Sequence, residues 1–134
     1  MDIAAPTTPG ALSVADRFVA ALDTLEARGD SDPLIAMFAD GAALESLGKV
    51  EEGLDAPKRF WSRYRDQFDE IRSSFSKVIE EPGAVALIWR SRGRLKAGKP
   101  IDYTGVRILE LDGDRIVRFQ TIYDSAQFTS VPAQ

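Results

Sequence analysis

The side chains that could do chemistry in this sequence are acids, tyrosines and arginines, because it contains neither cysteine nor histidine. Their absence excludes thiol nucleophiles, thiolate zinc sites, Ser-His-Asp triads and every imidazole base. Glu45 and Asp124 are the best candidates for a general base, although acids of this type often only cap a turn or meet solvent. No acidic segment has calcium-binding spacing, so we expect neither a metal site nor a cofactor.

Arg107 and Tyr103 are the best candidates for stabilising negative charge. A buried arginine stays charged and is costly unless an acid, other acceptors or an anionic ligand face it. One interpretation is an ion pair with Glu110 or another acid, or a solvated side chain. The other is a clamp on a carboxylate or enolate, with Tyr103 or Tyr64 donating a second hydrogen bond. Ser46 has no base beside it and is a poor nucleophile.

The face on which Arg107 lies depends on the register of one predicted hairpin. The stretch GVRILELDGDRIVRFQTIYD, residues 105–124, is apolar on both faces and contains an Asp-Gly turn signal. A two-residue turn would place Arg107 on the face opposite Phe119. A three-residue loop with Gly113 as a bulge would place it on the face of Phe119, Thr121 and Tyr123. A slip of one residue moves every side chain to the other face, and periodicity alone does not choose.

A second cationic group alternates along one predicted strand and therefore shares a face; it consists of Arg90, Arg92, Arg94 and Lys96. These side chains could extend a cationic pocket wall beside Tyr103 and Arg107, form a solvated strand end, or dock an acidic partner. The whole sequence has a net charge of −4, which disfavours a general nucleic-acid binder.

Capping residues and hydrophobic periodicity predict helices first and long strands afterwards. Ser13 caps a first helix that Gly29 ends, and Asp32 caps a short second helix. A strand over residues 42–47 precedes a third helix that begins within residues 53–57 and runs to about Phe68. Four strands follow, over residues 71–81, 85–96, 101–111 and 115–123. This order predicts an α+β fold with three helices on one face of a curved antiparallel sheet.

The third predicted helix carries an aromatic stripe. Phe60, Tyr64 and Phe68 are four residues apart, with Trp61 beside them. Simple core packing explains such a stripe, and the alternative is that part of it lines a cavity.

The length of 134 residues fits one domain. We expect it over residues 13–128, between a flexible arm at residues 1–12 and a tail at residues 129–134. No stretch is long and apolar enough to cross a membrane, and the first residues do not form a secretory signal. We therefore expect no membrane association and a cytoplasmic location.

Two segments of the chain resemble one known superfamily. The stretch MFADGAALESLGKVEEGLDAPKRFW, residues 37–61, is similar to the helix–strand–loop–helix of the nuclear transport factor 2-like superfamily, in its SnoaL-like and ketosteroid-isomerase branch. Residues 98–124 are similar to the closing hairpin of the same superfamily, with its Asp-Gly turn and terminal aromatic-Asp pair.

The resemblance implies a cone-shaped fold, in which a strongly bent sheet wraps an interior pocket that the three helices plug at one side. It also implies a homodimer through the convex sheet face, and it favours Tyr103 and Arg107 inside the pocket. On this comparison the ligand pocket contains Met37, Phe38, Ser46, Phe60, Trp61, Tyr64, Tyr103, Arg107, Phe119 and Tyr123.

The same comparison shows that the known catalytic residues of the superfamily are replaced. Ser46, Leu22 and Arg107 stand where the steroid isomerases have a base and two oxyanion-hole residues. Arg92 and Thr121 stand where limonene-epoxide hydrolases need acids, and no histidine can serve a cyclase-type step. The resemblance therefore leaves open whether the chain is an enzyme.

We expect a pocket protein that binds a small apolar molecule bearing a carbonyl or carboxylate. If it is catalytic, it would act without a cofactor as an isomerase, cyclase, dehydratase or hydrolase. The alternative is a non-catalytic ligand-binding or protein-interaction domain of the same fold.

Overall fold

The computed structural model describes residues 13–128, and the predicted arm and tail lie outside the described residues. Among these residues no helix is long and apolar enough to span a membrane. The elements are α1 (Val14–Arg28), α2 (Asp32–Ile35), β1 (Phe38–Ser46), β2 (Lys49–Glu51), α3 (Ala56–Asp66), β3 (Phe68–Glu81), β4 (Ala84–Leu95), β5 (Pro100–Asp112), β6 (Arg115–Tyr123) and the 3₁₀ turn η1 (Ala126–Phe128).

The ends of α1 are those predicted from its capping residues. Ser13 Oγ accepts a hydrogen bond from the Asp16 N–H at 3.0 Å, which satisfies one of the free donors of the first turn. Gly29 adopts φ 75° and donates its N–H to the Leu25 carbonyl at 2.8 Å. Glycine has no Cβ to oppose this left-handed conformation, so the helix ends here.

Three predicted boundaries are wrong by a few residues. The N-cap of α2 is Ser31, and Asp32 is its first helical residue rather than its cap. The strand predicted from residue 42 already begins at Phe38. Finally, α3 ends before Phe68, because that residue pairs with β4 as the first residue of β3.

The sheet is mixed, with six strands in the order β2-β1-β6-β5-β4-β3. The four long strands pair antiparallel, as predicted. The exception to the predicted antiparallel sheet is β1, which pairs parallel with β6. Two neighbouring strands that run in the same direction need a long connection between them. Here the chain between β1 and β6 forms α3 and the three long strands β3, β4 and β5.

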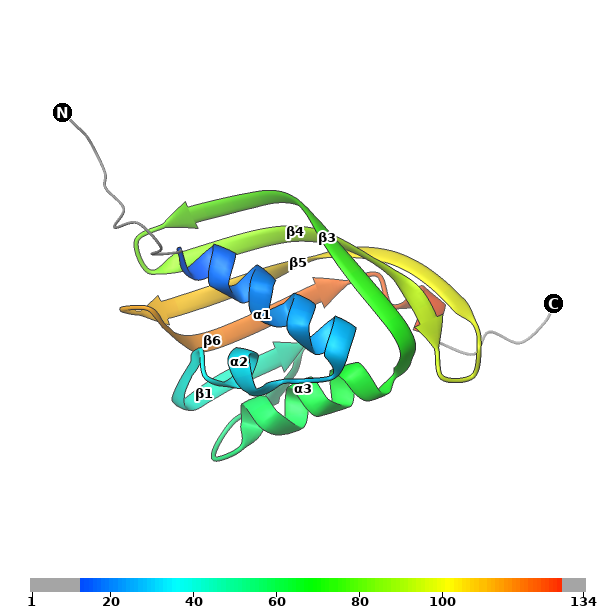
Figure 1. The fold of residues 1–134 in the computed structure, drawn as a ribbon. Helices are drawn as coiled ribbons and strands as arrows, with labels where there is room; N and C mark the ends of the chain where they lie inside the picture. The colour runs from blue at the N-terminus through cyan, green and yellow to red at the C-terminus, as the bar shows by residue number, and fades with distance from the viewer. Residues whose placement is uncertain (1–12, 129–134) are drawn as a thin grey trace.

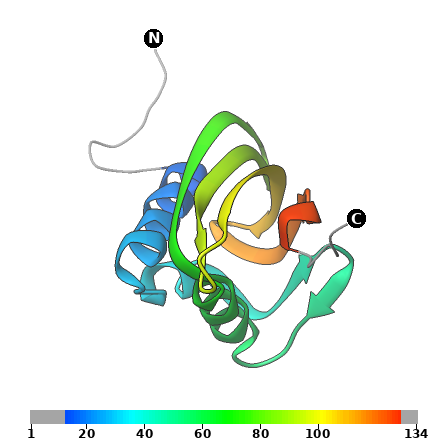
Figure 2. The same cartoon turned by 90° about the vertical axis from the view of Figure 1, so that its right-hand side faces the viewer.

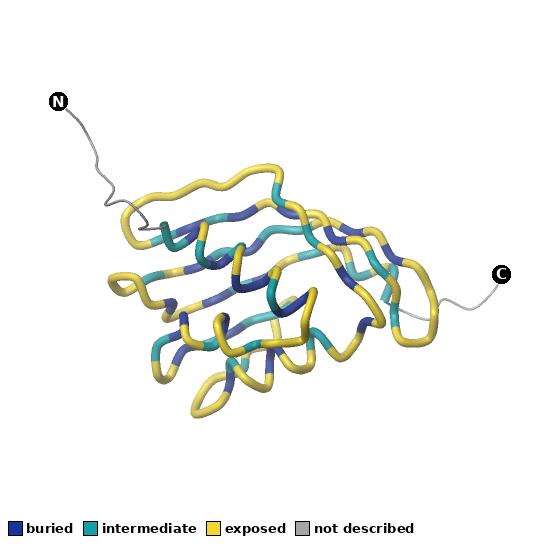
Figure 3. Tube along the Cα trace, viewed as in Figure 1, coloured by how far each residue is buried: buried dark blue, intermediate teal, exposed yellow. Residues whose placement is uncertain are grey.

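The sheet curls around the helices, and α1 and α3 cover part of its concave face (Figures 1 and 2). Buried and exposed positions alternate along the strands, so that one face of each strand points inward (Figure 3). The main core lies between these helices and the concave face, where aromatic rings meet edge to face: Phe18, Phe38, Phe60, Trp61 and Phe119. The predicted α+β cone is therefore confirmed.

The register of the β5–β6 hairpin places Arg107 opposite Thr121 and on the concave face. Arg107 therefore shares a face with Phe119 and Thr121, as the resemblance favoured. The bulge that the sequence alternative placed at Gly113, however, is not what produces this arrangement. Asp112 pairs with Arg115, so the hairpin loop has two residues.

The bulge lies further along β6. Glu110 pairs with Arg118 whereas Leu111 pairs with Ile116, which leaves Val117 as an extra residue. Such a bulge reverses the inward and outward positions that follow it on β6, so Phe119 and Thr121 lie on the same concave face as Arg107 of β5.

The alternating arginines of β4, Arg90, Arg92 and Arg94, lie on the convex face, so they do not extend the pocket wall. Arg90 and Arg92 pair with Asp102 at 2.7 and 3.5 Å, and Arg94 pairs with two acids of β3. The hydrogen bond from Arg90 holds the pKa of Asp102 below its ordinary value. Lys96 lies beyond the end of β4.

A group of apolar residues lies on the same face, and we call it the convex patch. Its six members sit in adjacent registers of four strands: Ile79, Ala86, Ile88, Val106, Ile108 and Ile122. Ile79, Ile88 and Ile122 remain 54%, 37% and 49% exposed. The hairpin is thus apolar on both faces because one face lines the interior and the other contributes to this patch.

Substituting Gly105 with alanine tests the packing of the concave face. The added Cβ would lie 2.4 Å from the Ile122 carbonyl oxygen and 2.6 Å from Trp89 Cζ2, so backbone or ring must move. We expect Gly105→Ala to lower the free energy of unfolding by about 1–3 kcal/mol in urea melts. Thr104→Ser, at the exposed neighbouring position, should change it by less than about 0.5 kcal/mol. Equal stability of the Gly105→Ala variant and the wild type would contradict this packing.

Candidate functional site

A cavity of about 810 Å³ lies between α3, the β1–β2 turn, strands β4 to β6 and η1. Its wall is largely aromatic. Eight of the ten predicted pocket residues line it: Ser46, Phe60, Trp61, Tyr64, Tyr103, Arg107, Phe119 and Tyr123. The structure therefore brings together side chains from α3, β1, β5 and β6 that are far apart in the sequence.

Met37 and Phe38 do not line this cavity, so their placement in the pocket is corrected. Phe38 is buried in the aromatic core, against Trp61 and Phe119. Met37 lines a smaller hollow between α1, α2 and the β5–β6 turn. Both residues sit at the start of β1, whereas the cavity is reached only at its end, by Ser46.

Arg107 is the charged group inside the cavity wall, and it is 2% exposed. Its guanidinium carbon lies 4.2 Å from the centre of the Trp89 ring and 5.8 Å from that of Tyr64. Among the described residues no acid forms an ion pair with it, and Glu110 pairs with Arg118 on the convex face instead. Aromatic faces attract the cation, but they leave its N–H groups free.

Hydrogen-bond donors without a protein partner gather at this wall. Seven buried side-chain nitrogen and oxygen atoms of the described residues lack such a partner, and five of them belong to residues that line the cavity. They are Trp61 Nε1, Trp89 Nε1, Arg107 Nε, Arg107 Nη1 and Thr121 Oγ1. Because unsatisfied buried groups cost free energy, this wall suits a ligand rich in acceptors.

A buried carboxylate stands directly behind the cavity. Glu26, on α1, is 3% exposed and accepts hydrogen bonds from Tyr64 at 2.7 Å and from Ser73 at 2.6 Å. Ser73 and Ser91 are 2.6 Å apart, and since Ser73 uses its hydrogen on Glu26, Ser91 donates to Ser73. The Tyr64 hydroxyl uses its hydrogen on Glu26, so its oxygen is left to accept a further hydrogen bond rather than to donate the one that the sequence suggested.

Two tyrosines of the wall, the partly buried Tyr64 and the buried Tyr103, resist ionisation in the native state. Burial raises the pKa of Tyr64 well above its ordinary value, and the positive charge of Arg107 only partly opposes this. Burial likewise raises the pKa of Tyr103, again against the charge of Arg107. Around Arg107 the wall therefore combines this permanent cation with the neutral phenols of Tyr64 and Tyr103.

The two residues predicted as candidates for a general base do not line the cavity, so this prediction is corrected. Glu45 points to the other face of β1 and pairs with Arg118 at 2.9 Å. Asp124 is exposed after β6 and accepts the Ala126 N–H at 3.0 Å. Strand alternation explains Glu45, because its neighbour Ser46 takes the inward position.

The only acid that lines the cavity within the described residues is Glu51 at its rim. It pairs with Arg63 and, at 3.9 Å, with Arg59. Three cations line the cavity, Lys49, Arg63 and Arg107, so its lining carries a formal charge of +3 − 1 = +2.

Sequence reasoning missed several lining residues, notably Trp89, Thr121 and Phe128. Trp89 lies between the outward residues Ile88 and Arg90 of β4, and Thr121 lies two residues from each of the inward aromatics Phe119 and Tyr123 of β6, so strand alternation could have found both. Glu26 falls four residues after Leu22 on the buried stripe of α1, which is an unusual place for an acid. No pattern in the sequence points to Phe128.

Comparison with known families now assigns the chain. The sequence profile of the SnoaL-like domain matches residues 15–119, well over half of the 134 residues. The chain belongs to the SnoaL-like domain family. This SnoaL-like protein has cavity residues both within the matched range, such as Arg107, and beyond it, such as Phe128. A search of curated proteins found no match.

Solved structures share the fold at low sequence identity. An NTF2-like protein of unknown function from Exiguobacterium sp. 255-15 is 22% identical with a TM-score of 0.73, over 85% of this chain and 100% of that chain. A protein assigned as an isomerase from Rhodopseudomonas palustris is 14% identical with a TM-score of 0.77, over 87% and 93%. A protein assigned as a SnoaL-like polyketide cyclase from Jannaschia sp. CCS1 is 15% identical with a TM-score of 0.69, over 90% and 92%. These similarities show the NTF2-like fold.

Alkaline titration tests the buried phenols. Because unfolded tyrosines ionise near pH 10, the unfolded state releases protons above that pH which Tyr64 and Tyr103 retain in the native state. The free energy of unfolding should therefore be unaffected by these groups below about pH 10 and fall as the pH rises further. Tyrosinate absorbance at about pH 11 should be lower in native than in urea-unfolded protein. Tyr64→Phe should reduce that difference, and an equal absorbance of both states would contradict the burial.

Proposed function

We propose that this SnoaL-like protein binds a small apolar molecule that carries a carboxylate, an enolate or a carbonyl oxygen. The observation that carries the proposal is Arg107, a buried cation on aromatic faces with N–H groups that no described residue accepts. A ligand oxygen would receive those donors, and the aromatic wall would hold the apolar body. The formal charge of the lining also favours an anion.

If the site is catalytic, the chemistry that fits it is cofactor-free isomerisation, cyclisation, dehydration or hydrolysis. Arg107 would stabilise negative charge that develops on an oxygen. Tyr64, backed by Glu26, would offer an oxygen acceptor to the same space. Proteins of this fold assigned as an isomerase and as a polyketide cyclase make such reactions a reasonable class to test.

A second candidate function is ligand binding without turnover. It is favoured by one observation: the only acid among the described lining residues, Glu51, is already paired with arginines. A general base would then have to act through Tyr64 rather than touch the ligand directly.

Thermal stabilisation by matched bicyclic ligands tests the binding proposal. We expect 2-naphthoic acid to raise the melting temperature, by an amount that grows with RT ln(1 + [L]/Kd), more than 2-tetralone, a lactone or an epoxide of similar size. Arg107→Met should lose the response to the acid. Without ligand it should be as stable as the wild type or more stable, because removing an unpaired buried charge is often favourable.

The control is Arg72→Met, which removes an exposed arginine that pairs with Asp23 on the surface. This variant should keep the full response to the acid. Equal stabilisation of wild type and Arg107→Met would contradict the role of Arg107, and no shift with any of the four ligand classes would contradict the proposed function.

We also propose that two copies associate through the convex patch. Its six apolar residues form one continuous surface across four strands, and soluble monomers seldom expose such a surface. The paired arginines Arg90 and Arg92 lie next to it and would form a polar rim.

Sedimentation of a charge variant tests the dimer. Ile88→Glu places a carboxylate at the middle of the convex patch and should convert a dimer into a monomer, because a buried unpaired charge opposes association. Leu54→Glu, at a position that is 86% exposed and outside the patch, should leave the dimer intact. A wild-type protein that sediments as a monomer at all concentrations would refute this association.

A further inference from the structure

The last described turn, η1, contributes Phe128 to the cavity wall and is held by an unusual contact. β6 ends at Tyr123, opposite Gly105, while β5 continues back to Pro100. The edge of β5 toward β6 therefore runs on without a strand beside it. Backbone donors and acceptors at such an edge need another partner.

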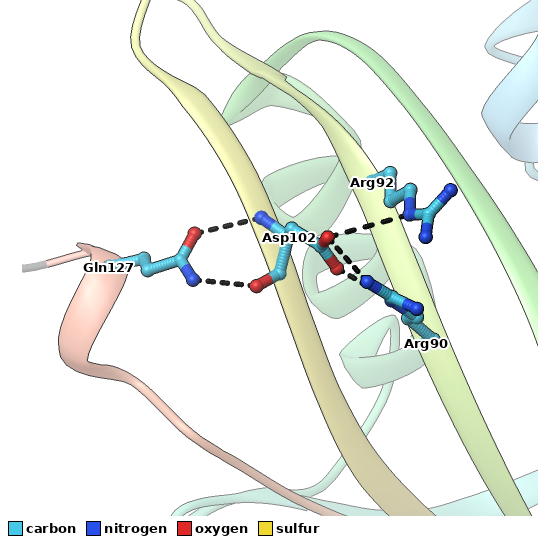
Figure 4. A network of polar contacts seen from close by, with 4 residues as sticks. All are labelled: Arg90, Arg92, Asp102 and Gln127. Carbon is cyan, nitrogen blue, oxygen red and sulfur yellow. Dashed lines mark hydrogen bonds and ion pairs between the residues drawn. The ribbon is translucent and has the colours of Figure 1, made fainter.

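The side chain of Gln127 supplies that partner (Figure 4). The Asp102 N–H donates to Gln127 Oε1 at 2.8 Å, and Gln127 Nε2 donates to the Asp102 carbonyl at 2.6 Å. The side-chain amide thus pairs with β5 as a peptide group of a neighbouring strand would. Lys99 Nζ adds a third bond, to the Gln127 carbonyl at 2.9 Å. We call these three bonds the Gln127 clasp.

The clasp fixes the residue that follows it. The Phe128 ring packs against Tyr103, Tyr123 and Phe68, with ring centres 4.8, 5.7 and 6.1 Å apart. Phe128 also lines the cavity. It is therefore a wall residue supplied by a three-residue turn rather than by the sheet or a long helix.

Phe128 and Arg107 lie at different points along the same strand. Phe128 contacts Tyr103, and Arg107 follows Tyr103 by four residues on β5, a rise of about 13 Å. A ligand whose acidic group binds Arg107 and whose body extends along β5 toward Tyr103 would therefore meet the Phe128 ring.

We propose that Phe128, held by the Gln127 clasp, limits the length of the ligand that Arg107 anchors, and so determines which acids the cavity selects. The ligand class is an aromatic or alicyclic body joined to a carboxylate by a short alkyl chain. This inference rests on the proposed function, and it adds a specificity residue beyond the end of the matched family domain at residue 119.

A homologous series of acids tests the inference. Dissociation constants are measured by calorimetry for phenylacetic, phenylpropanoic, phenylbutanoic, phenylpentanoic and phenylhexanoic acids. In the wild type we expect affinity to rise about fourfold for each added methylene until the body reaches Phe128, and then to fall. In Phe128→Ala the optimum should move to an acid longer by at least one methylene, while the shortest acid binds as in the wild type.

Gln127→Ala should move the optimum in the same direction, because it releases Phe128 without altering the ring. Phe75→Ala is the matched control: Phe75 is a partly buried phenylalanine of the core that does not line this cavity. It should lower stability and leave the length optimum unchanged. If Phe128→Ala does not fold, Phe128→Leu should give a smaller move in the same direction.

The outcomes separate the two proposals. An unchanged length optimum in the Phe128 variants, with acids binding to the wild type and not to Arg107→Met, overturns the role of Phe128 and leaves the proposed function standing. Acids that bind to none of the proteins overturn the proposed function, and this inference with it.

Discussion

One extra residue in β6 decides which side chains of that strand reach the cavity. Val117 has no partner between Glu110 and Leu111, so the part of β6 that follows it has its inward and outward positions exchanged. Phe119 and Thr121 therefore face the helices, on the same side of the sheet as Arg107 and Leu109 of the neighbouring β5. Without this bulge Phe119 and Thr121 would lie on the convex face, and Ile122 of the convex patch would turn inward. The part of the cavity wall that β6 provides beside Arg107 and the outward position of Ile122 thus have a single geometric cause.

The structure accommodates a buried cation by surrounding it with rings instead of acids. Trp89 lies over Arg107, and it has the room to do so because Gly105 opposite it has no side chain. The nearest buried carboxylate, Glu26, is engaged by Tyr64 and Ser73. Its negative charge lies behind Tyr64, where it moderates the positive potential of the cavity without closing Arg107 into an ion pair. The donors of Arg107 consequently remain available to whatever enters.

Features fixed by neighbouring residues were the ones that the sequence predicted best. The cap at Ser13 and the stop at Gly29 depend on a few adjacent residues, and both are where they were expected. The aromatic stripe of α3 could be predicted from helical spacing alone. Phe60 and Trp61 contact both the core and the cavity, and the sequence could not distinguish such residues from residues that lie only in the core.

Features fixed by pairing between distant strands were harder to predict. The Asp-Gly pair pointed to the right hairpin, but the bulge lies among the β-branched residues Ile116 and Val117, which carry no bulge signal. The inward side of Arg107 was available only through the family resemblance. Glu45 and Asp124 were attractive because of their sequence neighbours, and strand alternation and a turn hold them outside. The contacts of Phe128 depend on where β6 ends, which no local pattern encodes.

The parallel pairing of β1 with β6 has a consequence for how this chain is made. β1 is complete by Ser46, yet its partner β6 is the last strand of the described residues and ends at Tyr123. On a ribosome, β1 and the short β2 would emerge long before the edge to which they belong. The helices could form early, but the sheet closes only when nearly the whole domain has been released, so a high contact order limits the folding rate. During that interval the apolar side of β1 is open to other chains, and synthesis rather than the finished fold is the stage most exposed to aggregation.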